Sequence, residues 1–559
     1  MAIQPKTAES YAPAIAELKK KKLASIPKAW VIPEESLPST SRTNVVEFTK
    51  ECGILDQAEL DLIATNATSL LNSLASKTVS VTKVITAFCK AAAIAHQLTN
   101  CLTEIYFTEA LERAAALDAC STPQGALFGC PISLKDQFQL EGKECNMGIV
   151  GWIGDISDKN SVLVDILLGA GAIITCRTNV SQALMFGESD NYVHGRTTNP
   201  FNRDLTCGGS SGGEGALIRM GGSLIGVGTD LGGSVRIPAA YQGLFGLRPT
   251  IDRMPYRGAR NSLLGMETIT SALGPLSRTL GGVTAFSEAV VDGKPWLLDP
   301  RVPEIPWKPE AVALGGIVDK SGKPRKPVFG VMSWDGATMP LPPMKRALNI
   351  AVDALKKEGY ELVDFSPPDA IWGESIVVRT YTADGGADLS ATFGLSGEPH
   401  HPSLITGSSS THLSTYESWQ LSREKLDYCQ QYLDAWNATA SKTITGLPID
   451  GLLLPPSIAP PHKHMQWHRA IFYTSCFNLV DYPAMVIPVN AFVDPRVDIP
   501  ATDYAGANER DCAIQAAYKP EDYKDAPLSI QLVGRRFREE EVIGLTKVVV
   551  QAMKLDFLL

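Results

Sequence analysis

Residues 161–179 read SVLVDILLGAGAIITCRTN, and two kinds of secondary structure follow each other within this short stretch. Its first part is an apolar run typical of a buried helix, and IITCRTN after it is a short β-type run. The same alternation continues outward, because further β-type runs bounded by Gly or Pro stand at 127–136, 223–230 and 243–249. Strands that alternate with helices predict an α/β layered architecture with a mixed or mainly parallel sheet.

The last quarter of the chain continues this pattern. PAMVIPVNAF (483–492) and APLSIQLVG (526–534) are mainly apolar, and the second is followed by REEEVIGLTKVVVQAMKL (538–555), which has helical spacing. We therefore expect two more buried strands and a helix in this part of the chain.

The texture of the sequence divides the 559 residues into two regions. Residues 1–115 are rich in Ala, Leu, Lys and Glu with apolar residues at helical spacing, which predicts a helical N-terminal layer packed on the core over 116–559. Within the core, 295–470 is richer in Pro, polar and aromatic residues. We interpret it as an insertion that shapes a pocket, although a surface excursion fits the pattern equally well. One large domain is expected rather than several.

Composition and charge exclude several classes of protein. With 44% hydrophobic and 20% charged residues the chain has the composition of a globular protein. Its net charge of -9 and pI near 5.5 argue against nucleic acid or an anionic membrane as a partner, because both need a concentrated basic surface. No run of 18 apolar residues occurs, so we expect no transmembrane segment.

The cysteines indicate the compartment. There are eleven, an odd number, spread from Cys52 to Cys512 without a CxxC pair, and many lie in apolar stretches. This pattern is typical of reduced thiols rather than of a disulfide framework or a zinc site. The N-terminus lacks the apolar centre of a signal peptide, and LDFLL at the C-terminus matches no retention signal. We expect a cytoplasmic protein, and a homodimer is left open.

A glycine-rich loop, TCGGSSGGEGAL at 206–217, allows three interpretations. A phosphate loop of the type GxxxxGK[ST] needs a lysine, whereas here Glu214 follows the glycines and would repel an anion. The nucleophile elbow GxSxG fits around Ser210 and again around Ser211, but none of the eight histidines is an obvious partner. The third interpretation needs no histidine.

Two other positions support this third interpretation. Lys135 ends the apolar run CPISL, and lysine is seldom fully buried, so the ordinary reading is a strand-end lysine that reaches solvent. Ser234 follows Gly232 and Gly233, and two glycines permit a tight turn that aims successive N–H groups at one point, as an oxyanion hole requires. A turn with Ser234 as a helix N-cap is equally compatible.

Taken together and in this order, PISLKD, CGGSSGGEGAL and GVGTDLGGSVRIPAA resemble the amidase signature family of serine hydrolases. The intervals agree with members related to fatty acid amide hydrolase: 75 residues separate Lys135 from Ser210, and 24 separate Ser210 from Ser234. The flanks GRTTNPFN, NLVDYPAMVIPV and APLSIQLVGRR resemble the fungal acetamidase or general amidase branch. The resemblance implies a large, mixed, twisted β-sheet sandwiched by α-helices.

The resemblance also implies a Ser-Ser-Lys triad. Ser234 matches the nucleophile that becomes acylated, Ser210 the bridging serine whose preceding peptide bond is cis, and Lys135 the general base. The matching oxyanion hole consists of the backbone amides of Leu231, Gly232, Gly233 and Ser234. For Lys135 to act as a base its pKa has to fall from about 10.4 towards roughly 7 to 8, and burial pushes it in that direction.

Other polar residues nearby are weaker candidates for the site. Ser211 is expected to hydrogen-bond Lys135, and Asp230 with Arg236 to brace the loop by an ion pair, although each could be purely structural. Leu184 aligns with a pocket residue of the family, and an ordinary core leucine is the competing interpretation. The spacing of His462, His464 and His468 suits a metal, but no matching carboxylate or cysteine set accompanies it, so we expect no metal and no cofactor.

The function implied by the resemblance is hydrolysis of a carboxamide to a carboxylic acid and ammonia or a small amine. Small aliphatic or aryl amides are the expected substrates, and esters and carbamates stay open. Two alternatives are a glutamine-hydrolysing subunit of an amidotransferase and, from a different class, a non-catalytic nucleotide-binding protein.

Overall fold

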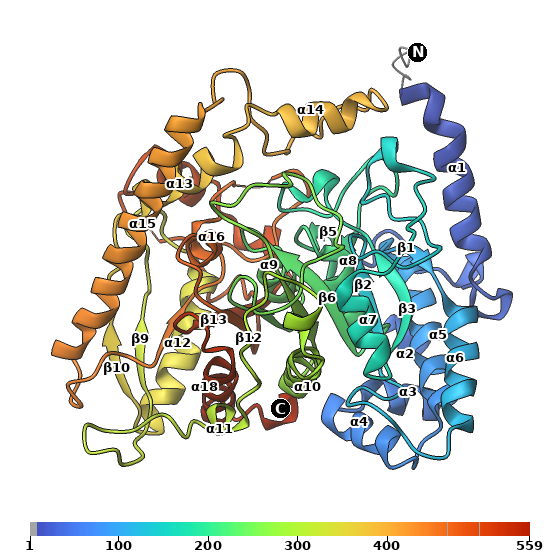
Figure 1. Cartoon of the computed structure of the whole chain (residues 1–559), viewed down its shortest axis with the longest axis horizontal. Helices are drawn as coiled ribbons and strands as arrows, with labels where there is room; N and C mark the ends of the chain where they lie inside the picture. The colour runs from blue at the N-terminus through green and yellow to red at the C-terminus, as the bar shows by residue number, and fades with distance from the viewer. Residues whose placement is uncertain (1–7, 467, 502–503) are drawn as a thin grey trace.

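One mixed sheet of eleven strands runs through the molecule (Figure 1). The structure is a computed structural model that describes residues 8–466, 468–501 and 504–559. In spatial order the strands are β1 (Leu102–Ile105), β3 (Ile173–Thr178), β2 (Pro131–Lys135), β6 (Ile225–Asp230), β8 (Ala272–Ser277), β7 (Phe245–Arg248), β12 (Ala484–Phe492), β13 (Pro527–Val533), β11 (Gly451–Leu454), β9 (Val328–Val331) and β10 (Glu361–Asp364).

The sheet is parallel in two places and antiparallel between them. β2 pairs in parallel with both β3 and β6, and β9 pairs in parallel with both β10 and β11. The pairings from β6 through β8, β7, β12 and β13 to β11 are antiparallel. The predicted α/β architecture with a large mixed sheet is confirmed.

Helices cover this sheet, and α10, α12 and α18 pack against β8, β12 and β13 while α8 and α9 pack against β2, β6 and β7. The helices of the described residues are α1 (Ala8–Ala24), α2 (Phe48–Glu51), α3 (Gln57–Ala64), α4 (Ala67–Ala75), α5 (Val81–Thr99), α6 (Phe107–Ala119), α7 (Val162–Gly169), α8 (Gly212–Arg219), α9 (Arg236–Tyr241), α10 (Leu280–Asp292), α11 (Pro309–Val312), α12 (Pro342–Lys357), α13 (Ala370–Tyr381), α14 (Ala387–Gly394), α15 (Thr415–Ala438), α16 (Phe472–Leu479), α17 (Glu509–Ala517) and α18 (Glu539–Ala552).

The N-terminal region is mainly helical, and α1 to α6 gather at one end of the sheet, drawn in blue in Figure 1. It also contains a strand that the helical spacing did not predict. α5 ends at Thr99, the next residue, Asn100, has a left-handed φ of 55° that turns the chain, and β1 then pairs antiparallel with β3. The region therefore supplies the edge of the sheet as well as a layer on it.

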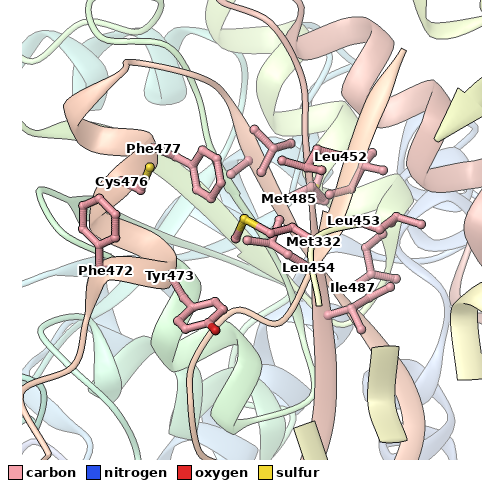
Figure 2. Packing of buried hydrophobic residues seen from close by; sticks show 14 of the residues in the cluster. Met332, Leu452, Leu453, Leu454, Phe472, Tyr473, Cys476, Phe477, Met485 and Ile487 are labelled. Carbon is pink, nitrogen blue, oxygen red and sulfur yellow. The ribbon is translucent and has the colours of Figure 1, made fainter. Parts of the chain in front are cut away.

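The less regular region 295–470 is likewise part of the core. It contributes β9, β10 and β11, so the sheet continues through it. Figure 2 shows α16 beside this part: Tyr473 and Phe477 lie on the side of the helix nearer Leu452 of β11 and Met485 of β12, whereas Phe472 packs against Tyr428 of α15.

Two glycines in β6 allow the loop 206–217 and α8 to lie directly on the sheet. A Cβ atom on Gly226 would stand 2.0 Å from Glu214 Oε2, and one on Gly228 would stand 2.7 Å from Ser211 Oγ. Since β2 lies beside β6 in parallel, the end of β2 reaches the same loop. These two elements position the site.

The cysteines are all free thiols, and most lie inside the molecule. Cys120 and Cys512 are exposed, and Cys52 and Cys429 are half-buried. Among the described helices none combines the length and the apolar character that crossing a membrane needs.

Candidate active site

Lys135 is the last residue of β2 and is completely buried. Its Nζ lies 2.8 Å from Ser210 Oγ, 2.7 Å from Thr229 Oγ1 and 3.5 Å from the Thr229 carbonyl oxygen. The strand does not carry this amine to solvent, so the ordinary reading of a strand-end lysine is wrong. The amine is instead held beside the serine of the glycine loop.

The glycine loop bends sharply at Ser210, and the peptide bond between Gly209 and Ser210 is cis. Gly208 has a φ of 84°, and a Cβ atom on Gly209 would stand 2.8 Å from the backbone of Gly187 and Glu188. Ser189 Oγ accepts a hydrogen bond of 2.8 Å from the Gly212 N–H, where α8 begins. The glycines thus permit a bend that passes close to neighbouring backbone.

Ser234 lies in the turn between β6 and α9, next to the glycine loop. The Ser211 N–H donates to the Ser234 carbonyl oxygen at 3.2 Å, which joins the two segments. Gly233 has a φ of 133°, and a Cβ atom there would stand 2.4 Å from Thr474 Oγ1. Ser234 Oγ makes no hydrogen bond to another of the described residues. In apo structures such contacts are often long and tighten only with substrate.

A buried ion pair holds this turn. Arg236 and Asp230 are both fully buried, and Arg236 Nη2 lies 2.8 Å from Asp230 Oδ1. Asn478 Nδ2 donates to the same carboxylate at 3.0 Å, and so does the Gly233 N–H at 2.8 Å. The expected brace between Asp230 and Arg236 is therefore present.

The amide of Gly233 differs from the expectation, because Asp230 already accepts its hydrogen bond. A buried carboxylate needs several donors, and this one takes a member of the expected oxyanion hole. Within the described chain the N–H groups of Leu231, Gly232 and Ser234 meet no protein acceptor. Three of the four expected donors are thus available in this turn.

A small apolar cavity opens at Ser234. It leaves about 40 Å³ for the centres of water-sized molecules. Leu184 lines it, together with side chains from segments far apart in the sequence: Met185, Phe186, Leu231, Ile237, Tyr381, Ile405 and Ile471. Tyr381 and Ile405 come from the region 295–470, which therefore contributes to the pocket.

Comparisons with known proteins identify the family of this chain. Residues 83–543 match the family model described as Amidase. An acetamidase of Emericella nidulans is 36% identical over 533 residues, covering 94% of this chain and 95% of that protein. The chain belongs to the amidase signature family. It is a hydrolase of amide carbon–nitrogen bonds.

Two solved structures with similar folds are a fatty acid amide hydrolase and a bacterial aryl acylamidase. The structure of a fatty acid amide hydrolase matches this amidase with a TM-score of 0.90 and 30% identity, covering 99% of this chain and 97% of that one. A bacterial aryl acylamidase matches with a TM-score of 0.68 at 20% identity, covering 87% and 96%, and shares the fold.

Burial sets the charge of the groups around Lys135 in this amidase. Burial lowers the pKa of Lys135 to about 7, although the carboxyl groups of Asp230 and Glu214 oppose this. Burial raises the pKa of Glu214 to about 8, against the hydrogen bonds from Ser133 and Thr178 and the charge of Lys135. Burial alone would raise the pKa of Asp230, but Arg236 and Asn478 hold it well below its ordinary value.

Ser211 does not form the expected hydrogen bond with Lys135. Its Oγ lies 3.5 Å from the Thr229 carbonyl oxygen, so Ser211 and Lys135 share an acceptor rather than bonding each other. The histidines lie elsewhere too, since His464 Nδ1 contacts Glu188 and His462 Nδ1 contacts the Lys463 carbonyl oxygen. In the part of the chain that the structure describes, no group of three metal-ligating side chains occurs.

Sequence reasoning missed several residues of the site. Thr229 and Gln137 lie behind Lys135, joined by a hydrogen bond of 2.7 Å from Thr229 Oγ1 to Gln137 Oε1. Thr474 Oγ1 donates to the Gly232 carbonyl oxygen at 2.7 Å, and Tyr381 Oη donates to that of Leu231 at 2.6 Å. Gln137 stands two residues after Lys135, which is the one signal the sequence offered; the others come from distant segments.

Proposed function

We propose that this amidase hydrolyses a carboxamide with a small acyl group through an acyl-enzyme on Ser234, with Ser210 and Lys135 as proton carriers. The observation that carries the proposal is the contact of 2.8 Å between Lys135 Nζ and Ser210 Oγ in a buried site beside Ser234. An amine whose pKa is about 7 is largely neutral at physiological pH, so it can accept a proton.

In the acylation step, Ser234 Oγ attacks the carbonyl carbon of the substrate. Its proton passes to Ser210 Oγ, whose own proton passes to the lone pair of Lys135 Nζ. A serine hydroxyl is a weak nucleophile until a base removes its proton, so the relay is needed for attack. The oxygen that becomes negative is stabilised by the unpaired amides of the turn, and the loss of one such donor typically costs about 10² to 10³ in rate.

The same relay serves the leaving group. The amine must leave protonated, and Lys135 returns its proton through Ser210 to the leaving nitrogen as the tetrahedral intermediate breaks down. Water then attacks the acyl-enzyme, the relay takes up its proton in the same way, and Ser234 is regenerated with release of the carboxylic acid. The relay ends each half-reaction in its starting state, so no cofactor is required.

The cavity supports a small, uncharged acyl group. Its lining residues, all of them described, are apolar apart from Ser234 and Tyr381, and none of them carries a charge. The charged α-amino and α-carboxylate groups of glutamine would lose their hydration there without a partner, which disfavours the amidotransferase alternative. Short aliphatic and aryl amides fit this cavity best, and the E. nidulans relative carries the name acetamidase.

Labelling with a fluorophosphonate tests the nucleophile. We expect the reagent to modify the native enzyme on the peptide that contains Ser234, and Ser234→Ala to abolish both labelling and amide turnover. Heat-unfolded wild-type enzyme, which has lost the turn, is the control and should not react. If Ser234→Ala still labels and hydrolyses amides, the assignment of the nucleophile is wrong.

A substrate panel tests the acyl group. Acetamide, benzamide, an anilide, a carbamate and glutamine are assayed side by side for release of ammonia or amine. We expect the uncharged short amides to be hydrolysed and glutamine to be inert. Preferential hydrolysis of glutamine would contradict the proposal.

A further inference from the structure

A neutral lysine can act as a base only if its lone pair faces the proton it has to accept. Neutral Lys135 carries two N–H hydrogens and one lone pair, and three oxygens surround its Nζ. Two of these belong to Thr229 and one to Ser210. If a hydroxyl of Thr229 donated to Nζ, the lone pair would be occupied and Ser210 would have no proton acceptor. The direction of the Thr229 hydroxyl therefore matters.

The hydroxyl of Thr229 has one hydrogen, and its polar neighbours are Lys135, Gln137 and the Tyr256 hydroxyl. Thr229 Oγ1 lies 2.7 Å from Lys135 Nζ and 2.7 Å from Gln137 Oε1, and the residue is 2% exposed, so water does not compete. The amide oxygen of Gln137 can only accept a hydrogen bond. The Tyr256 hydroxyl carries its own hydrogen and can donate to Thr229. The single hydrogen of Thr229 is therefore directed at Gln137, and Oγ1 is left to accept from Lys135.

Gln137 is held in the orientation that this requires. Its side chain is completely buried, and its Nε2 donates to Tyr256 Oη at 2.7 Å and to Asn261 Oδ1 at 3.3 Å. The Gln137 carbonyl oxygen accepts from the Arg260 N–H at 2.8 Å, which places the segment with Tyr256 and Asn261 beside it. With Nε2 bound on that side, Oε1 faces Thr229.

We propose that Thr229 and Gln137 are positioning residues that turn the lone pair of neutral Lys135 toward Ser210. Hydrogen bonds run in one direction, from Lys135 to Thr229, from Thr229 to Gln137 and from Gln137 to Tyr256. After proton transfer the ammonium of Lys135 has three hydrogens, and the three oxygens around it accept them. The arrangement suits both charge states of the base. It rests on the proposed function.

Removal of the acceptor on Gln137 gives a specific expectation. In Gln137→Met the Thr229 hydroxyl loses its partner and can donate to the lone pair of Lys135, in competition with Ser210. A hydrogen bond to the neutral form of the base also lowers its pKa. We expect the plateau of the rate to fall about tenfold, on the order of the effect of one hydrogen bond, while the acid limb of the pH profile moves to lower pH.

The test measures the rate constant of fluorophosphonate labelling at Ser234, together with kcat/KM for acetamide, between pH 5.5 and 9.5. The variants are Gln137→Met, Thr229→Val and the double variant, with Thr229→Ser as the control that keeps the hydroxyl. Thr229→Val is expected to slow labelling but to leave no competing donor. The double variant should therefore be labelled faster than Gln137→Met, and its acid limb should not show the shift expected for Gln137→Met. Thr229→Ser should behave as the wild type.

The results distinguish a failure of the proposed function from a failure of the positioning role. If wild-type enzyme is not labelled at Ser234, the proposed function fails and the positioning role fails with it. If the wild type labels but Gln137→Met and Thr229→Val keep its plateau and acid limb, only the positioning role is overturned. A purely structural role would make the two losses add in the double variant, with no shift in the acid limb. Thermal unfolding of each variant identifies a loss of folded enzyme, and Thr229→Ser, which changes one methyl group, still reports on the hydroxyl.

Discussion

The pKa of Lys135 is lowered because β2 ends in a buried position, and no unusual neighbour is needed to explain it. The strand stops under the loop 206–217, so the amine is buried and the charged form loses its hydration. Burial is the largest influence and lowers the pKa to about 7, while Asp230 and Glu214 act in the opposite sense. At neutral pH the enzyme thus contains both the neutral and the charged lysine.

The rate of acylation should follow this equilibrium. Below the pKa of about 7 Lys135 is protonated and cannot accept a proton, so kcat/KM should fall about tenfold for each unit of pH. Above pH 8 the amine is neutral and the rate should reach a plateau. The measurement is kcat/KM for acetamide between pH 5.5 and 9.5. A flat profile between pH 6 and 9 would count against a lysine base.

At the scale of residues, the candidate site residues that carry local motifs were named from the sequence, and the structure brings them close together. Lys135, Ser210 and Ser234 each stand in a distinctive stretch, and their spacing agreed with the family. Thr229 stands in an ordinary strand, and Thr474 and Asn478 reach the turn from a helix some 240 residues away. Such contacts arise from the sheet order, which one sequence does not contain. The occupied amide of Gly233 could not be foreseen for the same reason.

At the scale of elements, α13 forms a wall of the small cavity at Ser234. Tyr381 at its end is 4% exposed, and its Oη donates to the Leu231 carbonyl oxygen at 2.6 Å. The ring also borders a second, larger cavity, which leaves about 540 Å³ for the centres of water-sized molecules. Leu421 and Trp419 of α15 line that second cavity with Leu263. Tyr381 thus lines both the small cavity at Ser234 and this larger one.

Shortening this side chain should change the chain length that the enzyme accepts. We expect Tyr381→Ala to join the two cavities, so that each methylene of a longer acyl chain that enters gains about 0.8 kcal/mol. Two methylenes are then enough to raise kcat/KM about tenfold. The ratio of kcat/KM for hexanamide to that for acetamide should therefore rise by tenfold or more. The matched control is Tyr381→Phe, which keeps the ring and should keep the preference for short chains. An unchanged preference in Tyr381→Ala would show that Tyr381 does not limit the acyl group.

The elements themselves were predicted where their pattern was strong. The runs at 127–136, 223–230 and 243–249 became β2, β6 and β7, and the last quarter gave β12, β13 and α18 as expected. β1 was missed because its four residues lie between two long helices, and only Asn100 and its turn interrupt the helical spacing. β9, β10 and β11 are equally short and lie in the irregular region. No periodic pattern in the sequence marks them as strands, and they are recognised only by their pairing in the sheet.

At the scale of the whole molecule, the sheet brings the two halves of the site together. β2 and β6 supply Lys135 and the turn of Ser234, and they lie near one end of the strand order. α16 and α13 follow much later in the chain and contact the same turn through Thr474 and Tyr381. The site therefore depends on the complete fold and not on the N-terminal motifs alone.

The distribution of the thiols has a practical consequence. In the native protein Cys120 and Cys512 are exposed, whereas burial raises the pKa of Cys101 and of Cys145 to about 12, which keeps them as unreactive thiols. Iodoacetamide should add two alkyl groups rapidly to the native chain, more slowly at the half-buried Cys52 and Cys429, and all eleven in denaturant. Rapid uptake of all eleven by the native enzyme would contradict this. Intact mass spectrometry counts the alkyl groups on each chain. This number rises when unfolding exposes the buried thiols, so unfolding can be followed without any substrate.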